Sequence, residues 1–336
     1  MQNFLIIQTA FIGDVVLATA LAEKLHQYFP AAPIDLLVRK GNEALLQNNP
    51  LINQVLIWDK QQNKKRNLWK MALRVRKQKY THVINVHRFG TSGFITFLSG
   101  AKNKIGFDKN PFSFCYTKKV QHIISEPYAL NPVHETGRNQ MLINDITDAI
   151  PALPKLYISA TDREKIKNLQ GQPYICIAPS SVWFTKQFPV EKWVDLINAL
   201  PADHTIYLLG GPADAVMADD IIRMAKHGHI KNLCGSFNFL QSAALLEGAV
   251  MNYANDSAPL HFASAVNAPV TAVYCSTVPA FGFGPLSQNS KVVEIPERLY
   301  CRPCGLHGYK SCPQGHFRCA FEIPNEELLW WTLRKI

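Results

Sequence analysis

The chain of 336 residues is long enough for two domains with a cleft between them. A hydrophobic fraction of 47% against a charged fraction of 18% excludes a largely disordered protein. The net charge of +10 lies in residues 1–155, so we expect that half to have an anionic partner, such as a nucleic acid, an anionic membrane or a phosphorylated substrate.

Two further observations argue against secretion or membrane insertion. Residues 1–3 lack a basic region, and Asp14 interrupts the first apolar stretch too early for a secretory signal. The longest uncharged stretch, residues 257–290, holds four prolines and a histidine, which fits a helix, a strand and a loop rather than a membrane span. The sequence thus predicts a cytoplasmic protein, which a membrane surface can still attract.

Along the first half, short apolar runs alternate with helical periodicity. The helical segment Val15–Tyr28 repeats a leucine at every fourth residue. This alternation predicts a parallel sheet covered by helices on both faces. The expected strands are Phe4–Thr9, Ile34–Val38, Val55–Trp58 and Val83–Val86.

The same alternation restarts after Pro151 and Pro154, which predicts a second doubly wound half and a boundary between residues 150 and 172. Because ligands of such sheets bind beyond the carboxyl ends of the strands, we expect the active site in a cleft between the halves. A short terminal helix, Asn325–Arg334, carries Trp330 and Trp331. The other expected elements are the strands Tyr174–Ala178, Thr205–Leu209, Val250–Ala254 and Val270–Cys275, and the helices Val190–Leu200, Ala213–Ala225 and Phe239–Glu247.

The loop after the first strand carries Gly13 and Asp14. Glycine permits a tight turn, and aspartate is favoured at a helix start, so Asp14 has an ordinary capping interpretation. The functional interpretation is a carboxylate at the mouth of the cleft that takes a proton from an attacking hydroxyl. The helix dipole would keep this carboxylate ionised, as a base requires.

Small hydroxyl residues and a lysine follow the strand that opens the second half. Ser180 and Ser181 come soon after Ala178, and Lys186 precedes Pro189, which suits a helix start. Hydroxyls, a lysine and a helix N-terminus together favour a phosphate site. The alternative is a lysine on an exposed loop.

Two more strand ends carry candidate ligand-binding residues. Asp214 follows Gly210-Gly211, where a backbone can approach a ligand closely. Asp214 either holds ribose hydroxyls or complements a helix dipole. After the strand Val250–Ala254, a polar cluster predicts either a phosphate and sugar site or an ordinary capped helix. Its candidate residues are Asp256, Ser257 and His261.

A strongly basic segment, Lys60–Lys79, contains nine Lys or Arg, no acid and one apolar stripe at helical spacing. It is either a solvated helix face or a contact with an anionic membrane or a phosphorylated acceptor. Nucleic acid is disfavoured because aromatic residues are not interleaved and no binding motif is present. The residues expected to make the contact are Lys64, Lys65, Arg66 and Arg74.

Four of the eight cysteines cluster near the C-terminus. Cys301-x-x-Cys304, with Cys312, Cys319 and two histidines, partly matches a structural zinc site, although a second Cys-x-x-Cys is missing. The alternative is a tight loop of reduced thiols, since disulfides are unusual in the cytosol. The other four, which we interpret as reduced core thiols, are Cys115, Cys176, Cys234 and Cys275.

Several motifs, taken in order, resemble those of glycosyltransferase family 9, the ADP-heptose:lipopolysaccharide heptosyltransferases. The run Gly13–Leu21 resembles the opening motif of that family. The similarity spans nearly the whole chain, although Ala258 replaces the glycine usual at its position. Further similar segments are Lys104–Phe107, His134-Glu135 with Arg138-Asn139, Lys186-x-Phe188-Pro189 with Trp193, and Asn255–Ser257 with Pro259 and His261.

The resemblance implies a GT-B architecture of two Rossmann-like domains, with residues 1–155 binding the acceptor and residues 156–336 binding a nucleotide sugar. It implies an inverting, metal-independent transfer of heptose from ADP-heptose to a lipopolysaccharide core or lipid A-type acceptor. The enzyme would need no cofactor and would work at the inner face of the cytoplasmic membrane.

The family motifs also imply roles for individual residues. By motif position, Asp14 would be the general base, and Lys186 with Ser180 or Ser181 would hold the donor phosphates. Asp214 would lie near the ribose, and Asp256 near the sugar or a phosphate.

Three alternatives remain open. A GT-B enzyme with another nucleotide-diphosphate sugar would carry similar motifs. A dinucleotide-dependent oxidoreductase would need Gly-x-Gly-x-x-Gly after the first strand, where residues 8–14 contain only Gly13. A non-catalytic protein that binds anionic glycolipid would fit the basic half but would leave Lys186 and the second domain without a role.

Overall fold

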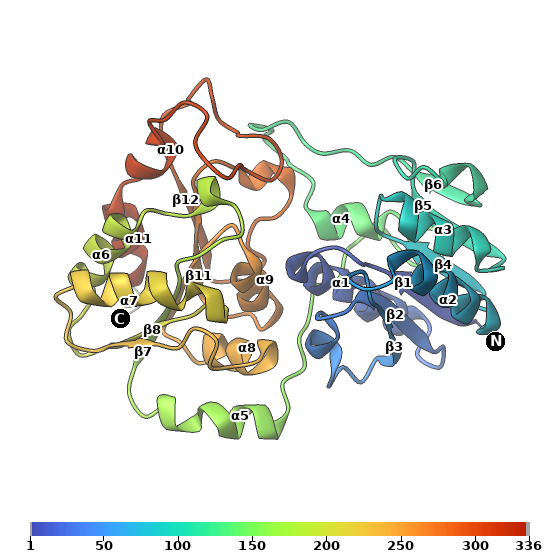
Figure 1. The fold of residues 1–336 in the computed structure, drawn as a ribbon, viewed down its shortest axis with the longest axis horizontal. Helices are drawn as coiled ribbons and strands as arrows, with labels where there is room; N and C mark the ends of the chain where they lie inside the picture. The colour runs from blue at the N-terminus through green and yellow to red at the C-terminus, as the bar shows by residue number, and fades with distance from the viewer. Residues whose placement is uncertain (1, 334–336) are drawn as a thin grey trace. The chain divides into compact units, whose positions relative to one another are not determined.

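The computed structural model describes residues 2–333 and consists of two compact α/β units (Figure 1). Unit 1 comprises Met1–Ile124 and Val133–Tyr157, and unit 2 comprises Ser125–Pro132 and Ile158–Ile336. Each unit contains one six-stranded sheet whose paired strands are all parallel. The predicted fold class, two doubly wound parallel-sheet domains, is confirmed.

Unit 1 is built around a sheet of strand order β3-β2-β1-β4-β5-β6. Its first strand is buried throughout, as expected of a strand covered on both faces. In chain order the elements are β1 (Phe4–Ile7), α1 (Ile12–Tyr28), β2 (Ile34–Arg39), β3 (Ile52–Trp58), α2 (Lys64–Lys77), β4 (His82–Asn85), α3 (Gly90–Leu98), β5 (Asn103–Phe107), β6 (Lys118–Val120) and α4 (Glu135–Gln140), with short 3-10 turns at Glu43–Leu46 and Ser113–Cys115.

Unit 2 repeats this topology, with strand order β12-β11-β10-β7-β8-β9. Numbered within its own unit and read from β9, this sheet runs third, second, first, fourth, fifth and sixth strand, which is the order of the unit 1 sheet read from β3. The two halves show no sequence repeat. The elements are α5 (Ala160–Ile166), β7 (Tyr174–Ala178), α6 (Val190–Ala199), β8 (Thr205–Leu208), α7 (Ala215–Met224), β9 (Ile230–Asn232), α8 (Phe239–Glu247), β10 (Met251–Asn255), α9 (Ala258–Ala265), β11 (Val270–Tyr274), β12 (Ser290–Glu294), α10 (Arg318–Phe321) and α11 (Asn325–Leu333), with 3-10 turns at Lys167–Leu169, Phe184–Lys186, Pro212–Asp214 and Pro279–Phe281.

The strands that the sequence analysis did not anticipate lie toward the sheet edges. β6, β9 and β12 are edge strands, and β5 is the neighbour of β6. Edge strands are half exposed and tolerate polar residues, so their apolar signal is weak: β6 reads Lys-Lys-Val and β9 reads Ile-Lys-Asn. The predicted terminal helix is α11, whereas Arg334 and the side chains of Trp330 and Trp331 lie outside the described part of the chain.

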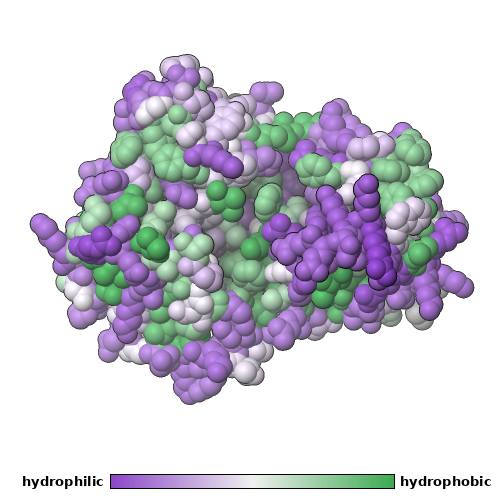
Figure 2. Space-filling view, viewed as in Figure 1, coloured by the Kyte–Doolittle hydropathy of each residue, from purple (hydrophilic) through white to green (hydrophobic). Residues whose placement is uncertain are grey.

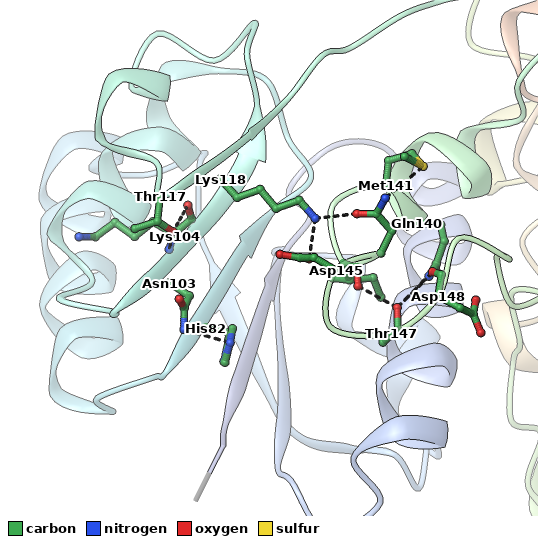
Figure 3. A network of polar contacts seen from close by, with 12 residues as sticks. His82, Asn103, Lys104, Thr117, Lys118, Gln140, Met141, Asp145, Thr147 and Asp148 are labelled. Carbon is green, nitrogen blue, oxygen red and sulfur yellow. Dashed lines mark hydrogen bonds and ion pairs between the residues drawn. The ribbon is translucent and has the colours of Figure 1, made fainter.

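A network of polar contacts fastens the segment that carries α4 to the rest of unit 1 (Figure 3). Lys118 of β6 forms an ion pair with Asp145 at 2.6 Å between Nζ and Oδ1. Asp148 accepts hydrogen bonds from Lys24 and Tyr28 of α1, at 3.0 and 2.6 Å. These contacts hold the segment that follows α4 to β6 and α1, and α4 itself packs on α1.

Within residues 2–333, none of the helices combines the length and the apolar character needed to cross a bilayer.

Candidate functional site

The candidate residues lie where the order of strands reverses. In each sheet the first and fourth strands of the unit are neighbours, namely β1 with β4 and β7 with β10. The chain leaves these two strands in opposite directions, which opens a crevice beyond their carboxyl ends. Asp14 follows β1, Lys186 follows β7, and Asp256 follows β10. Both units therefore have candidate residues at the position where such sheets bind ligands.

Asp14 lies in the first turn of α1 and not at the start that we predicted. The helix begins at Ile12, with Phe11 as its N-cap, and Gly13 has helical rather than turn geometry. The Phe11 N–H donates to Oδ2 of Asp14 at 3.2 Å. Asp14 thus satisfies one free amide of the helix from its third position, and the residue as a whole is half-buried.

The electrostatics of Asp14 also differ from the expectation. Burial raises the pKa of its carboxyl to about 6, and the negative charge of Glu135 adds to this effect. The amides of Phe11 and Asp14 and the charge of Arg88 lower the pKa but do not compensate. The helix dipole therefore does not dominate. A carboxylate with a pKa near 6 is mostly ionised at pH 7 and accepts a proton more readily than an ordinary aspartate.

Glu135 is held beside this site by a buried ion pair within α4. Its Oε2 accepts hydrogen bonds from Nε and Nη2 of Arg138, at 2.9 and 2.6 Å, and Nη1 of Arg138 donates to the Val133 carbonyl at 2.8 Å. The pair is almost fully buried. Because Arg138 holds Glu135 in place, the pair gives Asp14 a constant electrostatic environment.

Positive groups gather at the same edge of unit 1. Nζ of Lys60 donates to the Thr9 carbonyl at 2.6 Å, and burial together with the charges of Arg39 and Lys64 lowers its pKa to about 8. Burial and the charges of Lys60 and Arg88 lower the pKa of His87 to about 3, so its ring is neutral. This edge is therefore suited to an anionic ligand.

The four predicted acceptor-binding residues are exposed on α2. Of these four residues, only Lys64 is among the charges that lower the pKa of Lys60 at this edge. The sequence analysis did not single out Arg39 or Arg88, although each stands at or just after the end of a strand. The strand-end criterion that identified Asp14 would have found them.

In unit 2 the structure joins Lys186 to Asp256. Their Nζ and Oδ2 atoms lie 2.6 Å apart, and both side chains are largely buried. The Thr277 hydroxyl donates to the same Oδ2 at 2.7 Å. The Lys186 ammonium has three N–H groups, so Asp256 can orient it while other N–H groups remain for a ligand.

Ser180 and Ser181 lie between β7 and Lys186, as predicted. The Asn255 side chain donates to the carbonyls of Pro179 and Ser180, at 2.7 and 3.4 Å, and accepts from the Phe188 N–H at 3.0 Å. Asn255 thus ties the loop after β7 to the end of β10. Among the described residues, neither serine hydroxyl has a hydrogen-bond partner, so both are available to a ligand.

The other candidates of unit 2 have mainly structural contacts. Ser257 is the N-cap residue of α9, but its side chain makes no capping hydrogen bond. His261 is buried, with its ring 6.3 Å from that of Phe283. Asp214 accepts from the Gly211 N–H at 2.7 Å, and a side chain at Gly210 would meet Asp214 at 2.8 Å. Asp214 directly precedes α7, where an acid complements the helix dipole as the structural alternative expected, and a ribose contact remains a prediction.

The loop that contains the C-terminal cysteines packs on the Lys186 turn. The Tyr309 N–H donates to the Thr185 hydroxyl at 2.7 Å, and the Thr185 N–H donates to the Tyr309 carbonyl at 3.1 Å. Gly308 has φ +78°, and a Cβ there would lie 2.9 Å from the Thr185 hydroxyl oxygen and 3.0 Å from Cγ of Lys186. Only glycine fits this close approach.

Arg302 anchors the same loop to the end of β11. Its side chain is buried and donates to the carbonyls of Cys275, Thr277 and Tyr274, at 2.7, 2.7 and 3.2 Å. Thr277 in turn holds Asp256. The cysteine loop therefore supports both members of the Lys186–Asp256 pair, a relationship that no local sequence signal revealed.

The cysteines are all free thiols in the structure. Cys176 and Cys275 are buried as predicted, but Cys115 and Cys234 are only half-buried because they lie in turns beyond the strands. Within residues 2–333, no group of three or more His, Cys, Asp or Glu side chains is arranged to hold a metal ion.

Comparison with known proteins agrees with this geometry. Residues 68–308 match the family model of glycosyltransferase family 9 (heptosyltransferase). A lipopolysaccharide heptosyltransferase 3 of Escherichia coli is 26% identical over 291 residues, covering 83% of this chain and 85% of its own length.

Two solved structures share the fold. The ADP-heptose LPS heptosyltransferase II of E. coli has a TM-score of 0.76 at 19% identity, covering 100% of this chain and 99% of its own. E. coli heptosyltransferase WaaC with ADP has a TM-score of 0.74 at 17% identity, covering both chains fully. The two α/β units thus form a GT-B fold. The chain belongs to glycosyltransferase family 9, the heptosyltransferases, and is a glycosyltransferase.

Proposed function

We propose that this enzyme transfers heptose from ADP-heptose to the core or lipid A part of a lipopolysaccharide precursor. The observation that carries the proposal is the Lys186–Asp256 pair at the switch point of unit 2, with two available serine hydroxyls in the same loop. The named relatives, heptosyltransferases of E. coli, support heptose as the sugar and ADP as the nucleotide. An enzyme that uses another nucleotide-diphosphate sugar is the alternative.

In the proposed reaction, the ionised Asp14 removes a proton from an acceptor hydroxyl. The hydroxyl oxygen attacks the anomeric carbon from the face opposite the diphosphate, the bond to the diphosphate breaks, and the sugar inverts. Lys186, Ser180 and Ser181 stabilise the charge that develops on the departing diphosphate. These fixed donors take the part that a metal ion plays in other transferases. Asp214 and Asp256 position the ribose and the sugar.

We place the acceptor on unit 1, at the inner face of the cytoplasmic membrane. The support is the positive edge around Lys60 and the exposed basic side chains of α2. A phosphorylated lipid-linked acceptor would carry negative charge to this surface. The residues proposed for the contact are Lys64, Lys65, Arg66 and Arg74.

Nucleotide release tests the function directly. With ADP-heptose and a deacylated lipid A-type acceptor, we expect ADP to be released only when both are present. In a thermal-shift series with ADP, UDP, GDP and NAD, ADP should give the largest increase in melting temperature. Preference for UDP or GDP would establish the alternative donor, whereas stabilisation by NAD without sugar transfer would contradict a transferase.

Gly308→Ala is expected to weaken donor binding through the Lys186 turn. The added methyl would push on the Thr185 hydroxyl and on the Lys186 side chain, both within about 3 Å. We expect KM for the donor to rise several-fold, with a smaller change in kcat, in steady-state kinetics. Gly315→Ala is the matched control. Gly315 lies in the same loop at φ +72° with nothing within 4 Å, so its variant has the same backbone strain without the contact. An equal rise of KM in both variants would refute the positioning role.

A further inference from the structure

An exposed apolar surface lies beside the basic helix of unit 1. On α2, Trp69 and Leu73 are 54% and 58% exposed, and Phe97 on α3 is 43% exposed. Phe114, in the turn before β6, is 71% exposed. The two helices pack against each other. Large apolar side chains that are grouped on a surface mark an interaction site more often than scattered ones do.

Ring contacts join these side chains into one surface. The Trp69 ring meets Phe94 of α3 edge-on, with 5.0 Å between centroids, and Phe94 lies 6.1 Å from Phe112. Phe112 lies 6.0 Å from Phe97 and 5.9 Å from Phe114. Leu73 is one helical turn from Trp69 on α2. We call this set the aromatic patch: Trp69, Leu73, Phe94, Phe97, Phe112 and Phe114.

Positively charged side chains border the aromatic patch, and the stretch of chain that forms α2 and α3 contains no acidic residue. On α2, Lys65 and Arg66 precede Trp69 by about one turn. Arg76 and Lys77 follow Leu73 by about one turn. These basic residues therefore lie on the same side of the helix as Trp69 and Leu73. All four are exposed. The sequence holds no Asp or Glu between Asp59 and Asp108, a range that includes α2 and α3. Figure 2 shows hydrophobic surface next to hydrophilic side chains over this part of unit 1.

We propose that the aromatic patch inserts into the headgroup region of an anionic lipid bilayer, with α2 lying along the membrane surface. Aromatic rings favour the boundary between headgroups and acyl chains, and neighbouring Lys and Arg pair with anionic headgroups. A second copy of this chain is disfavoured as the occupant, because two such basic borders would repel each other. This inference rests on the membrane part of the proposed function and adds that aromatic side chains carry the contact.

Co-sedimentation of the full chain with vesicles tests the inference without donor or acceptor. With vesicles of phosphatidylcholine and phosphatidylglycerol, Phe97→Ser/Phe114→Ser is expected to lower the partition coefficient by about tenfold or more. The single variant Phe114→Ser, at the most exposed ring, should lower it in the same direction and serves if the double variant folds poorly. The control Ile150→Ser removes a side chain of unit 1 that is 71% exposed outside the aromatic patch, and should bind as the wild type does.

Unchanged vesicle binding of the double variant would overturn the inference. So would a wild-type dimer in sedimentation velocity that the double variant converts to monomers, because the aromatic patch would then join copies of the chain. Transfer to a short, water-soluble acceptor should stay at the wild-type rate in the double variant. A wild-type protein that binds vesicles but transfers no sugar would contradict the proposed function and leave this inference standing.

Discussion

Asp14→Asn is expected to reduce sugar transfer by about 100- to 10,000-fold, the usual effect of removing a general base. Asparagine has nearly the same shape and can still accept the Phe11 N–H, so the start of α1 should be preserved. Because the variant changes unit 1 alone, the Lys186 site of unit 2 should bind ADP with wild-type affinity. Single-turnover transfer and calorimetric titration of ADP measure the two quantities separately.

The pH profile supplies the internal control for this role. Since burial raises the pKa of Asp14 to about 6, the base is protonated below that pH and ionised above it. The wild-type kcat/KM should therefore fall about tenfold per pH unit below pH 6 and level off above it. This limb should be absent from the residual activity of Asp14→Asn. Near-normal turnover in the variant, or an unchanged acid limb, would exclude Asp14 as the base.

The raised pKa also predicts the effect on folding. The pKa of Asp14 is higher in the folded chain than the ordinary value of 3.8, so ionising it costs free energy in the native state above about pH 6. Asp14→Asn removes that cost, and the variant should be at least as stable to heat at pH 7.5 as the wild type. Loss of transfer without loss of stability would therefore be a chemical effect and not a folding defect.

Lys186→Ala is expected to weaken binding of the nucleotide sugar by about 10- to 100-fold, as for the loss of a hydrogen bond to a charged group. Transfer should fall further, because the same ammonium would stabilise the departing diphosphate. The variant also leaves the largely buried carboxylate of Asp256 without its cation, which costs about 3–5 kcal/mol of stability where a pair is fully buried. Calorimetry with ADP and thermal unfolding measure both effects.

A second variant separates the two consequences of losing Lys186. In Lys186→Ala/Asp256→Asn the unpaired charge is removed while the oxygen of the introduced amide can still accept the Thr277 hydroxyl, so stability should recover but donor binding should not. Lys192→Met is the matched control, since Lys192 lies over the Phe188 ring in the same unit and is not paired with Asp256. If Lys186→Ala bound ADP as tightly as Lys192→Met does, the proposed phosphate site would be wrong.

The sequence was informative wherever the physical signal is local. The alternation of buried runs with helical periodicity identified most of the central strands, because strands covered on both faces must be continuously apolar. These are β1, β2, β4, β7, β8, β10 and β11. Polar residues that follow those strands could be assigned to the ligand side of each sheet. Asp14, Lys186 and Asp256 were found in this way.

Tertiary structure alone decided which of these residues meet. Lys186 and Asp256 are adjacent because β7 and β10 pair in the sheet, although several elements separate them in the chain. The Thr277 hydroxyl, just after β11, donates to Asp256, and Arg302 of the cysteine loop donates to the Thr277 carbonyl. The periodicity of the sequence contains no information about such contacts.

The electrostatics of Asp14 are the second property that the sequence did not contain. Its place at a helix start suggested a readily ionised carboxylate, yet burial and Glu135, brought close by the packing of α4 on α1, raise its pKa. Local sequence determines the secondary structure and the side of the sheet on which a residue lies. Desolvation and Coulomb interactions depend on distances between segments remote in the chain, and only the folded structure establishes those distances.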